Sequence, residues 1–520
     1  MTTRRRLVTA TGGMAAVTVA SRFSGLVRDN VIARLLGAGM VSDAFVTAFR
    51  IPNMFRAFLA EGTLHAAFIP TLAELKKDGD AARAREFVRA MTGALLIALP
   101  VIVAIGVLAA PLLVTMVAAA FARDPAQFAL AVKLTRIMFP YLGLVSLAAL
   151  AQGVLNASDR FLLPAALPIA VNLCIVAGTV TGVVVFGGRP EWMGVGVLVG
   201  GLVQFGLQWL ACRDVGLALV PGRQAFSHPE VRRVLRLMLP GVPALGVYQI
   251  TLLFSNQLAA SLGNGAVFCV YNASRLNELV YGVLVVQLTT AVLPMLAAER
   301  VADEAKARAT LAFAIRLLSS VAIPSAVFSV LLAVPITGVL FGGGKYTIEA
   351  VHTTAGALVM YSLGLPFLGL SRLLANTSYA WKDTRSPLLA AVSSLVVFGG
   401  LGLVLARAMG VAGIAAAASC GQVANTLTLL WLDGRHRRLP RLRDVLPATG
   451  RHLIAAVGLG VVAFGLNRLF PVPLHTSVRS LAQLAAYAVT AGATYLALLV
   501  AVGAPEWREA REFMRRRRAA

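Results

Sequence analysis

The residues best suited to chemistry in this sequence are arginines that stand inside long apolar runs. A charged side chain at the centre of a bilayer costs about 2.5 to 3.5 kcal/mol or more, so each needs a compensating interaction. Guanidinium groups bind phosphate oxygens through planar, bidentate hydrogen bonds. A group of such arginines therefore predicts a site for a phosphate-bearing anion. Its candidate members are Arg22, Arg28, Arg50, Arg56, Arg275 and Arg372.

Acidic side chains at a similar depth are fewer than these arginines. The competing interpretation is that the arginines form structural ion pairs between helices, with Arg50 paired to Asp43. Arginine would remain in excess even if every acid formed such a pair. For the group as a whole we favour a water-filled cavity lined with guanidinium groups, which would hold an anionic substrate. The acids are Asp29, Asp43, Glu61 and Glu278.

Apolar segments long enough to cross a bilayer recur along the chain and must position these side chains. Of the 520 residues, 58% are hydrophobic and only 13% are charged, whereas soluble domains carry about 25% charged residues. We predict an all-α, polytopic membrane protein with about 14 transmembrane helices. The segment 42–72 is long enough for two pieces or one tilted helix. The predicted spans are 11–36, 42–72, 87–117, 130–156, 162–186, 191–212, 236–260, 270–298, 310–341, 350–378, 386–407, 411–432, 450–470 and 480–503.

The net charge of +24 is explained by membrane topology rather than by nucleic-acid binding. Lysines and arginines between spans tend to stay on the cytoplasmic side, and nearly all of those in this chain fall on one side. The other side has only Arg123, Arg189, Lys345 and Arg479. We therefore expect both termini to be cytoplasmic, no nucleic-acid partner, and attraction to anionic membrane phospholipids.

A weak internal repeat relates the two halves of the chain. The segment from Ala48 to Glu74 resembles the segment from Ala273 to Glu299, at an offset of about 224 residues. Repeated halves are common in secondary transporters, which place the substrate site between them near the bilayer midplane. The last two spans fall outside the repeat.

A membrane enzyme acting on a lipid-linked sugar is the alternative from another functional class. It would need paired acids or a histidine base in one cleft, and the sequence offers no such constellation. The four cysteines and six histidines lack the spacing of a metal site. We therefore expect a transporter rather than an enzyme, with no metal and no cofactor.

Several segments resemble the MurJ (MviN) family of lipid II flippases, and the likeness covers nearly the whole chain. The N-terminal blocks match the family's hallmark segments in order and spacing, and two later segments also resemble family sequence. The matching stretches are Ser21–Asp29, Ile32–Gly39, Ser42–Phe45, Phe49–Arg56, Ala60–Gly62, Ala67–Pro70, Tyr271–Glu278 and Tyr379–Pro387.

The resemblance implies the multidrug/oligosaccharidyl-lipid/polysaccharide exporter fold, in which two pseudo-symmetric six-helix bundles surround a central cavity. Two extra C-terminal helices form a lipid-facing groove. On this pattern, residues 1–213 form the first bundle, 214–433 the second, and 434–520 the two extra helices with a basic cytoplasmic tail.

The resemblance also implies roles for individual residues. Arg22, Arg28 and Arg275 would hold the diphosphate of the substrate. Arg56 and Glu61 would act in gating or in handling the headgroup. Further cavity or inter-bundle residues would be Asp29, Asp43, Arg50, Asn53, Glu278 and Arg372.

Two departures from the family pattern affect these expectations. Many relatives have an acid directly before the arginine matched by Arg275, and here that position is Ser274, which leaves this arginine without that partner. Some relatives bind sodium through an acid on helix seven and an Asn/Asp pair on helix eleven. Here helix seven offers Ser255 and Asn256, and 386–407 has neither Asn nor Asp. Hard cations need oxygen ligands, commonly carboxylates, so the sequence argues against sodium coupling there.

The function implied is a flippase that moves lipid II, the undecaprenyl-diphosphate-linked peptidoglycan precursor, from the cytoplasmic to the periplasmic leaflet by alternating access. A flippase for another polyprenyl-diphosphate-linked glycan is the alternative. The expected location is the bacterial inner membrane, and the cell-wall synthesis machinery is a further expected partner.

Overall fold

The computed structural model contains helices, turns and loops, and no strand longer than an isolated bridge between Gly343 and Tyr346 occurs in the part it describes. This confirms the predicted all-α fold class. The described residues are 3–59, 63–77, 80–238, 242–282, 292–293, 295–300, 303–436 and 438–504. Glu61, one of the predicted site residues, lies outside them.

The chain divides into two compact units, Met1–Val267 and Phe268–Ala520, each of which is described by itself. The predicted domain limits at 213 and 433 follow the sequence repeat instead of this division, and they stay a prediction.

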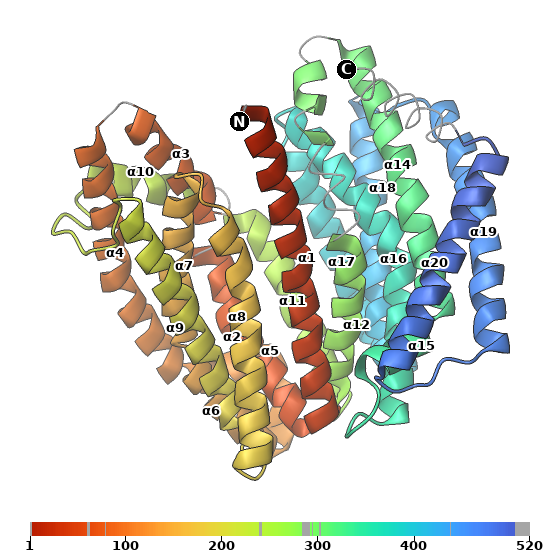
Figure 1. The fold of residues 1–520 in the computed structure, drawn as a ribbon, viewed down its shortest axis with the longest axis horizontal. Helices are drawn as coiled ribbons and strands as arrows, with labels where there is room; N and C mark the ends of the chain where they lie inside the picture. Colours follow the sequence, from red (N-terminus) through yellow and green to blue (C-terminus); the bar gives the residue numbers. More distant parts are fainter. Residues whose placement is uncertain are drawn as a thin grey trace. The chain divides into compact units, whose positions relative to one another are not determined.

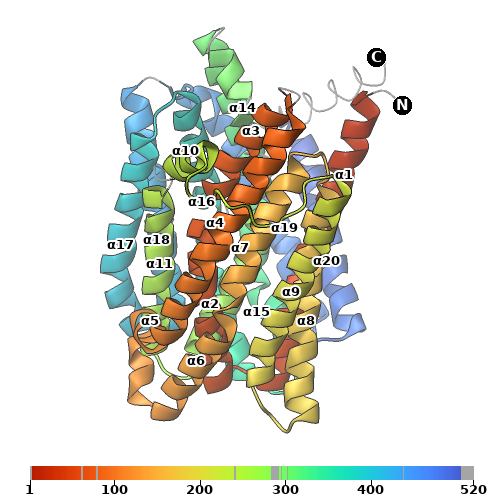
Figure 2. The same cartoon turned by 90° about the vertical axis from the view of Figure 1, so that its left-hand side faces the viewer.

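The first unit is a bundle of long helices, coloured red to yellow-green in Figure 1. The short amphipathic helix α10 lies across the others and is seen nearly end-on in Figure 2. The helices of this unit are α1 (Thr3–Leu36), α2 (Met40–Leu59), α3 (Thr63–Lys77), α4 (Ala81–Leu108), α5 (Ala110–Ala118), α6 (Pro125–Met138), α7 (Tyr141–Asn156), α8 (Leu162–Val180), α9 (Glu191–Asp214), α10 (Pro229–Met238) and α11 (Val242–Ser261), followed by the start of α12 (Ala266–Val280).

Packing in the first unit depends on small residues as well as on a buried apolar cluster. Helix α8 packs against both α9 and α1. At the α8–α9 contact, a Cβ on Gly178 would lie 2.3 Å from the carbonyl oxygen of Trp192, so only glycine allows this approach. Around Phe68 and Phe87, which are fully buried, residues of α3, α4, α7, α9 and α10 form a buried apolar cluster.

The second unit continues with α14 (Glu304–Leu331), α15 (Ala333–Phe341), α16 (Ile348–Ala380), α17 (Arg385–Met409), α18 (Val411–Arg435), α19 (Leu446–Leu469) and α20 (Val478–Ala501). Helix α18 packs against α16 and α17, while α14 contacts both α16 and α19. The pair α19 and α20 is joined to α14 and α15 by a separate apolar cluster that includes Leu332 and Tyr487. The pair therefore belongs to the folded unit and is attached along one face of α14.

Ten helical segments in the described chain are long and apolar enough to cross a membrane. The helices α1, α2, α11 and α12 are not among them, although each lies within or overlaps a predicted span. Helix α12 has only 15 residues and is shorter than a span. In α1, α2 and α11 polar side chains lower the hydropathy, which is expected of helices whose inner faces meet water or substrate instead of lipid. The predicted span 42–72 consists of two helices, α2 and α3.

The internal repeat is visible in the helix lengths. Helices α4 and α5 have 28 and 9 residues, and α14 and α15 also have 28 and 9 residues. Asp80 and Asp303 cap the long helix of each pair by accepting a hydrogen bond from a backbone N–H in its first turn. Pro111 and Pro335 lie in the first turn of α5 and α15, where a missing N–H costs nothing. The same capping aspartate and the same first-turn proline thus occur in both halves, and in both a 28-residue helix is followed by a 9-residue helix.

Candidate functional site

Arg28 is the most completely enclosed of the predicted substrate-binding arginines. Its Nε and Nη2 atoms donate to Oδ1 of Asp29 at 2.9 and 2.7 Å, and Nη1 donates to Oδ1 of Asn172 at 3.1 Å. The guanidinium carbon lies 5.7 Å from the ring centre of Phe49, within cation–π range. Arg28 is only 5% exposed and Asp29 2%. Arg28 thus forms an ion pair within its own helix, and its hydrogen bond to another helix is with the neutral Asn172.

Asn172 holds this arrangement from α8 and was not singled out by the sequence analysis. Its Nδ2 donates to Oγ of Ser24 at 2.8 Å, one helical turn before Arg28, and Ser24 Oγ donates to the backbone oxygen of Ser21 at 2.7 Å. Asn172 is 9% exposed. A sequence signal did exist, because Asn172 is the one strongly polar side chain of α8 and such residues inside spans are usually functional.

One face of α2 carries polar residues that contact α11 and the turn that follows it. Asp43, Thr47 and Arg50 are spaced so that they share this face. Oδ2 of Asp43 accepts a 2.6 Å hydrogen bond from the backbone N–H of Gly265. Nη1 of Arg50 donates to Oδ1 of Asn256 at 3.1 Å, and Nδ2 of Asn256 donates to Oγ1 of Thr47 at 3.3 Å. Together these contacts fasten α11 to α2.

The remaining predicted residues of the first unit lie near this face or on α1. Pro52 interrupts the hydrogen bonds of α2, and beside it Nδ2 of Asn53 donates to the carbonyl oxygen of Phe49 at 2.7 Å. Arg56 follows one turn later and is partly buried, as is Arg22 on α1.

Arg275 on α12 has a more open setting in the second unit. Its Nη1 donates to Oε2 of Glu278 at 3.1 Å, and its Nε donates to the hydroxyl of Tyr271 at 3.1 Å. The side chains of Arg275 and Glu278 are 39% and 46% exposed. Glu278, one helical turn further along α12, gives Arg275 an acidic partner although the residue directly before it is Ser274. Arg372, on α16, is exposed.

The structure thus brings the predicted residues together within each unit. Arg28 is joined to Asp29, and Arg275 is joined to Glu278. Asp43 and Arg50 are joined to α11 and its turn by separate hydrogen bonds. A common cavity holding the arginines of both units stays a prediction.

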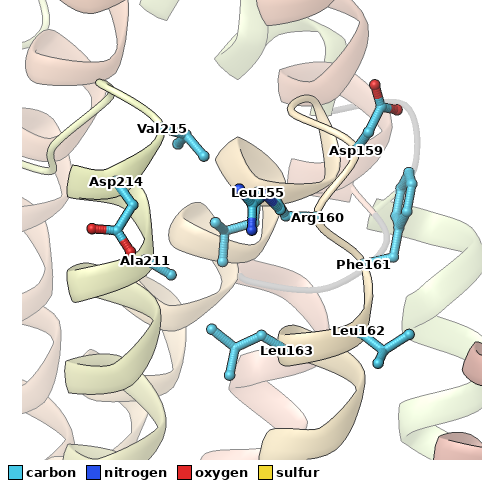
Figure 3. Close-up of a pocket in the computed structure, with 9 residues that line it drawn as sticks. All are labelled: Leu155, Asp159, Arg160, Phe161, Leu162, Leu163, Ala211, Asp214 and Val215. Carbon is cyan, nitrogen blue, oxygen red and sulfur yellow. The ribbon is translucent and has the colours of Figure 1, made fainter.

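A pocket of about 270 Å³ occurs in the first unit where α7, α8 and α9 meet (Figure 3). None of the predicted site residues lines it. Its wall is mainly apolar, with Asp159, Arg160 and Asp214 as its charged members. The pocket is therefore separate from the arginine site. The other lining residues are Leu155, Phe161, Leu162, Leu163, Ala211 and Val215.

A second buried charge network lies in the second unit, where loops meet the ends of α16 and α18. Nη1 of Arg438 donates to Oδ2 of Asp383 at 2.9 Å and to Oδ1 of Asp433 at 3.2 Å. Partial burial would raise the pKa of the Asp383 carboxyl, but hydrogen bonds from Ser386 and the Arg438 charge hold that pKa well below its ordinary value. Ser378 donates to Asp433 at 3.1 Å. The network ties the linker before α19 to the bundle.

The chemistry available at the arginine site is anion binding. Guanidinium groups offer several N–H donors in fixed directions, which suit carboxylate or phosphate oxygens. Among the described residues no group of three or more His, Cys, Asp or Glu side chains could hold a metal ion. Arg28 and Arg275, each in its own unit, carry donors of this kind.

Comparisons with known proteins identify the family. The model of the family described as "Lipid II flippase MurJ" matches residues 32–512. A "Lipid II flippase MurJ" from Burkholderia cenocepacia is 35% identical over 511 residues, which cover 96% of this chain and 97% of that protein.

Two solved structures share the fold. The "Lipid II flippase MurJ, inward closed conformation" superposes with a TM-score of 0.77 at 23% identity, covering 93% of this chain and 97% of that one. An inward-facing "multidrug resistance MATE family transporter of the MOP superfamily" superposes with a TM-score of 0.67 at 15% identity, covering 82% and 98%. The length of the family match and the identity to the Burkholderia protein show that this chain belongs to the MurJ family of lipid II flippases.

Proposed function

We infer that this protein is a lipid II flippase of the bacterial inner membrane, a multi-pass transporter and not an enzyme. Membership of the MurJ family carries this conclusion. The residue roles, the alternating-access path from the cytoplasmic to the periplasmic leaflet and the orientation that follow are our proposals. The single structural observation that supports them best is a buried arginine, Arg28, hydrogen-bonded to Asp29 and Asn172 inside the helical bundle.

Arg22, Arg28 and Arg275 bind the diphosphate of lipid II in this proposal, and Arg56 acts on the headgroup or in gating. Asp29 occupies two donors of Arg28 through one carboxylate oxygen, and a carboxylate and a phosphate present similar oxygen acceptors. A diphosphate carries more negative charge than one carboxylate, so it can displace Asp29 from the guanidinium. Between transport cycles, Asp29 then occupies the place of the phosphate and keeps the buried Arg28 charged and paired. Arg275 and Glu278 repeat this pairing on α12.

Asp43, Arg50 and Asn53 act in gating. Alternating access needs contacts that form in one state and break in the other. The polar face of α2 has a small number of directional bonds to α11 and its turn, so it can hold the two helices closed and release them together. Glu61 and Arg372 complete the proposed set as gate or cavity residues, following the family pattern.

The distribution of basic residues supports a cytoplasmic location for both termini. Arg232, Arg233 and Arg236 are exposed on α10, which lies across the long helices. Glu74 pairs with Arg233 at 3.0 Å and raises its pKa. An exposed basic helix at a bilayer surface attracts anionic phospholipids, which we propose as lipid partners. Cell-wall synthesis enzymes that consume lipid II at the outer leaflet are the expected protein partners.

The decisive experiment is depletion of this protein in its host, with an externally added enzyme that cleaves lipid II used to measure its exposure at the outer leaflet. We expect exposed lipid II to fall while total lipid II is maintained or rises. Unchanged exposure would contradict the proposal and favour another polyprenyl-diphosphate glycan as substrate.

Variants then test the site in the same assay. Arg28→Glu and Arg275→Glu should fail to restore exposure, because each reverses a charge that meets the diphosphate. Arg123→Glu, an exposed residue outside the site, is the control and should restore it. Normal growth with Arg28→Glu would refute the diphosphate role.

A further inference from the structure

Asn172 on α8 contacts Arg28 from another long helix, and the family pattern did not supply this residue. Its side chain lies between two residues of α1, with Oδ1 on Arg28 at 3.1 Å and Nδ2 on Ser24 at 2.8 Å. Ser24 and Arg28 are one helical turn apart, so both point to the same side of α1. A single amide of α8 therefore links two successive turns of α1 and contacts the Nη1 edge of the guanidinium.

The two bonds of Asn172 also fix the orientation of its own amide. The oxygen accepts from a charged donor and the nitrogen donates to a hydroxyl, which is the arrangement that satisfies both groups. Ser24 in turn donates to the carbonyl oxygen of Ser21 at 2.7 Å, so its Oγ is free to act as the acceptor for Asn172. The chain of bonds runs in one direction from Arg28 to the backbone of α1.

We propose that Asn172 is a positioning residue for substrate binding: with Ser24 it holds the Arg28 guanidinium in the orientation that receives the diphosphate. This rests on the proposed role of Arg28. Asp29 is charged and competes with the diphosphate for the same donors, whereas Asn172 is neutral. Asn172 can therefore stay bound to Nη1 when Asp29 is displaced, and it limits rotation of the guanidinium during that exchange. An arginine held at only one edge would lose this orientation.

A double-mutant cycle in purified full-length protein tests this proposal, with lipid II as the ligand and its dissociation constant as the readout. We expect Asn172→Ala to weaken binding about tenfold, the scale of one hydrogen bond to a charged group. Arg28→Ala should weaken binding at least as much. In the Arg28→Ala background, Asn172→Ala should have no further effect, because the residue acts through the arginine.

Two further variants separate positioning from a purely structural role. Ser24→Ala removes the second anchor of the amide while leaving the Arg28 contact in place, so it should weaken binding by a smaller factor. Leu173→Ala, the exposed neighbour on α8, is the matched control and should bind normally. Ser24→Ala also keeps the proposal testable if Asn172→Ala folds poorly.

Each result has a distinct meaning. Unchanged affinity in Asn172→Ala, or effects of Asn172→Ala and Arg28→Ala that multiply in the double variant, would overturn the positioning role. Normal lipid II binding by Arg28→Ala would instead refute the proposed role of Arg28. Absence of binding by the unmodified protein would refute the proposed function itself.

Discussion

The carboxylate of Asp43 accepts a 2.6 Å hydrogen bond from the backbone N–H of Gly265. Gly265 has a positive φ of 88°, and a Cβ at this position would lie 2.8 Å from the carbonyl oxygen of Ala38. The turn after α11 therefore approaches the loop between α1 and α2 as closely as the backbone allows. Asp43 is fully buried, so the charge of its carboxylate depends on such donors.

This relationship predicts different results for two substitutions of Asp43. Asp43→Ala should destabilise the protein by about 1.5 to 3 kcal/mol, because it removes a hydrogen bond to a charged group and leaves the Gly265 N–H without this acceptor. Asp43→Asn retains an oxygen that can accept the same hydrogen bond, so this variant should lose less stability than Asp43→Ala. The thermal unfolding midpoint in detergent measures the difference. Equal midpoints for the two variants would contradict the importance of this bond.

Asn256 links Arg50 to the rest of the α2–α11 contact and should be sensitive to substitution. It is 1% exposed, accepts from Arg50, and donates to Thr47 and to the carbonyl oxygen of Val117 at 3.1 Å. Asn256→Leu should lower the rate of lipid II exposure at the outer leaflet, because an apolar side chain leaves buried polar groups unsatisfied.

The control for Asn256→Leu is Gln257→Leu on the same helix. Gln257 is more exposed and bonds mainly to backbone groups of residues 115–119. We expect Gln257→Leu to retain most of the transport activity. If both variants lost transport equally, the α2–α11 contact would have no special role in gating.

The sequence predicted the helical class, and it singled out the arginines inside apolar runs, because both depend on composition; the role of these arginines in one site stays a prediction. Runs of about 20 apolar residues can only be helical spans, and the charges inside them stand out. The partners of those charges were harder to predict. Asp29 is adjacent to Arg28 in sequence, and neighbouring helical residues generally point in different directions, so their pairing required the structure. Asp43 bonds to a backbone N–H, which leaves no signal in a side-chain pattern.

The length of the second predicted span shows a different limit. Hydropathy alone could not distinguish one tilted helix over 42–72 from two shorter ones, because both bury a similar number of apolar residues. The structure has α2 ending at Leu59 and α3 beginning at Thr63.

Asn172 illustrates a third limit. A lone polar residue in a span indicates function, but its partners on α1 are set by tertiary packing.

The Asp383–Arg438 pair predicts a dependence of stability on pH. The pKa of Asp383 is lower in the folded protein than its ordinary value of about 3.9 in an unfolded chain. The folded state therefore binds fewer protons, so this pair stabilises the protein above about pH 4, and its contribution is lost as the pH falls below that value.

Thermal unfolding of Asp383→Asn at several pH values checks this prediction. The variant should unfold at a lower temperature than the unmodified protein at pH 7, and this difference in unfolding temperature should narrow below about pH 4. Asp444 is an exposed acid in the same linker, and Asp444→Asn should unfold at nearly the same temperature as the unmodified protein at every pH. A gap for Asp383→Asn that stayed constant down to pH 3 would contradict the predicted pKa.

The contact between α8 and α9 predicts that one glycine is essential while another on the same helix is replaceable. A Cβ on Gly196 would lie 2.6 Å from the carbonyl oxygen of Cys174, whereas a Cβ on Gly206 would meet nothing within 4 Å. Gly196→Ala should force α9 away from α8 and destabilise the protein by about 1 to 3 kcal/mol. Gly206→Ala should be neutral or slightly stabilising, because alanine favours the helix.

Because α8 also carries Asn172, Gly196→Ala should weaken lipid II binding as well as lower the unfolding midpoint. Unaltered stability of Gly196→Ala would show that the two helices lie farther apart than this packing requires.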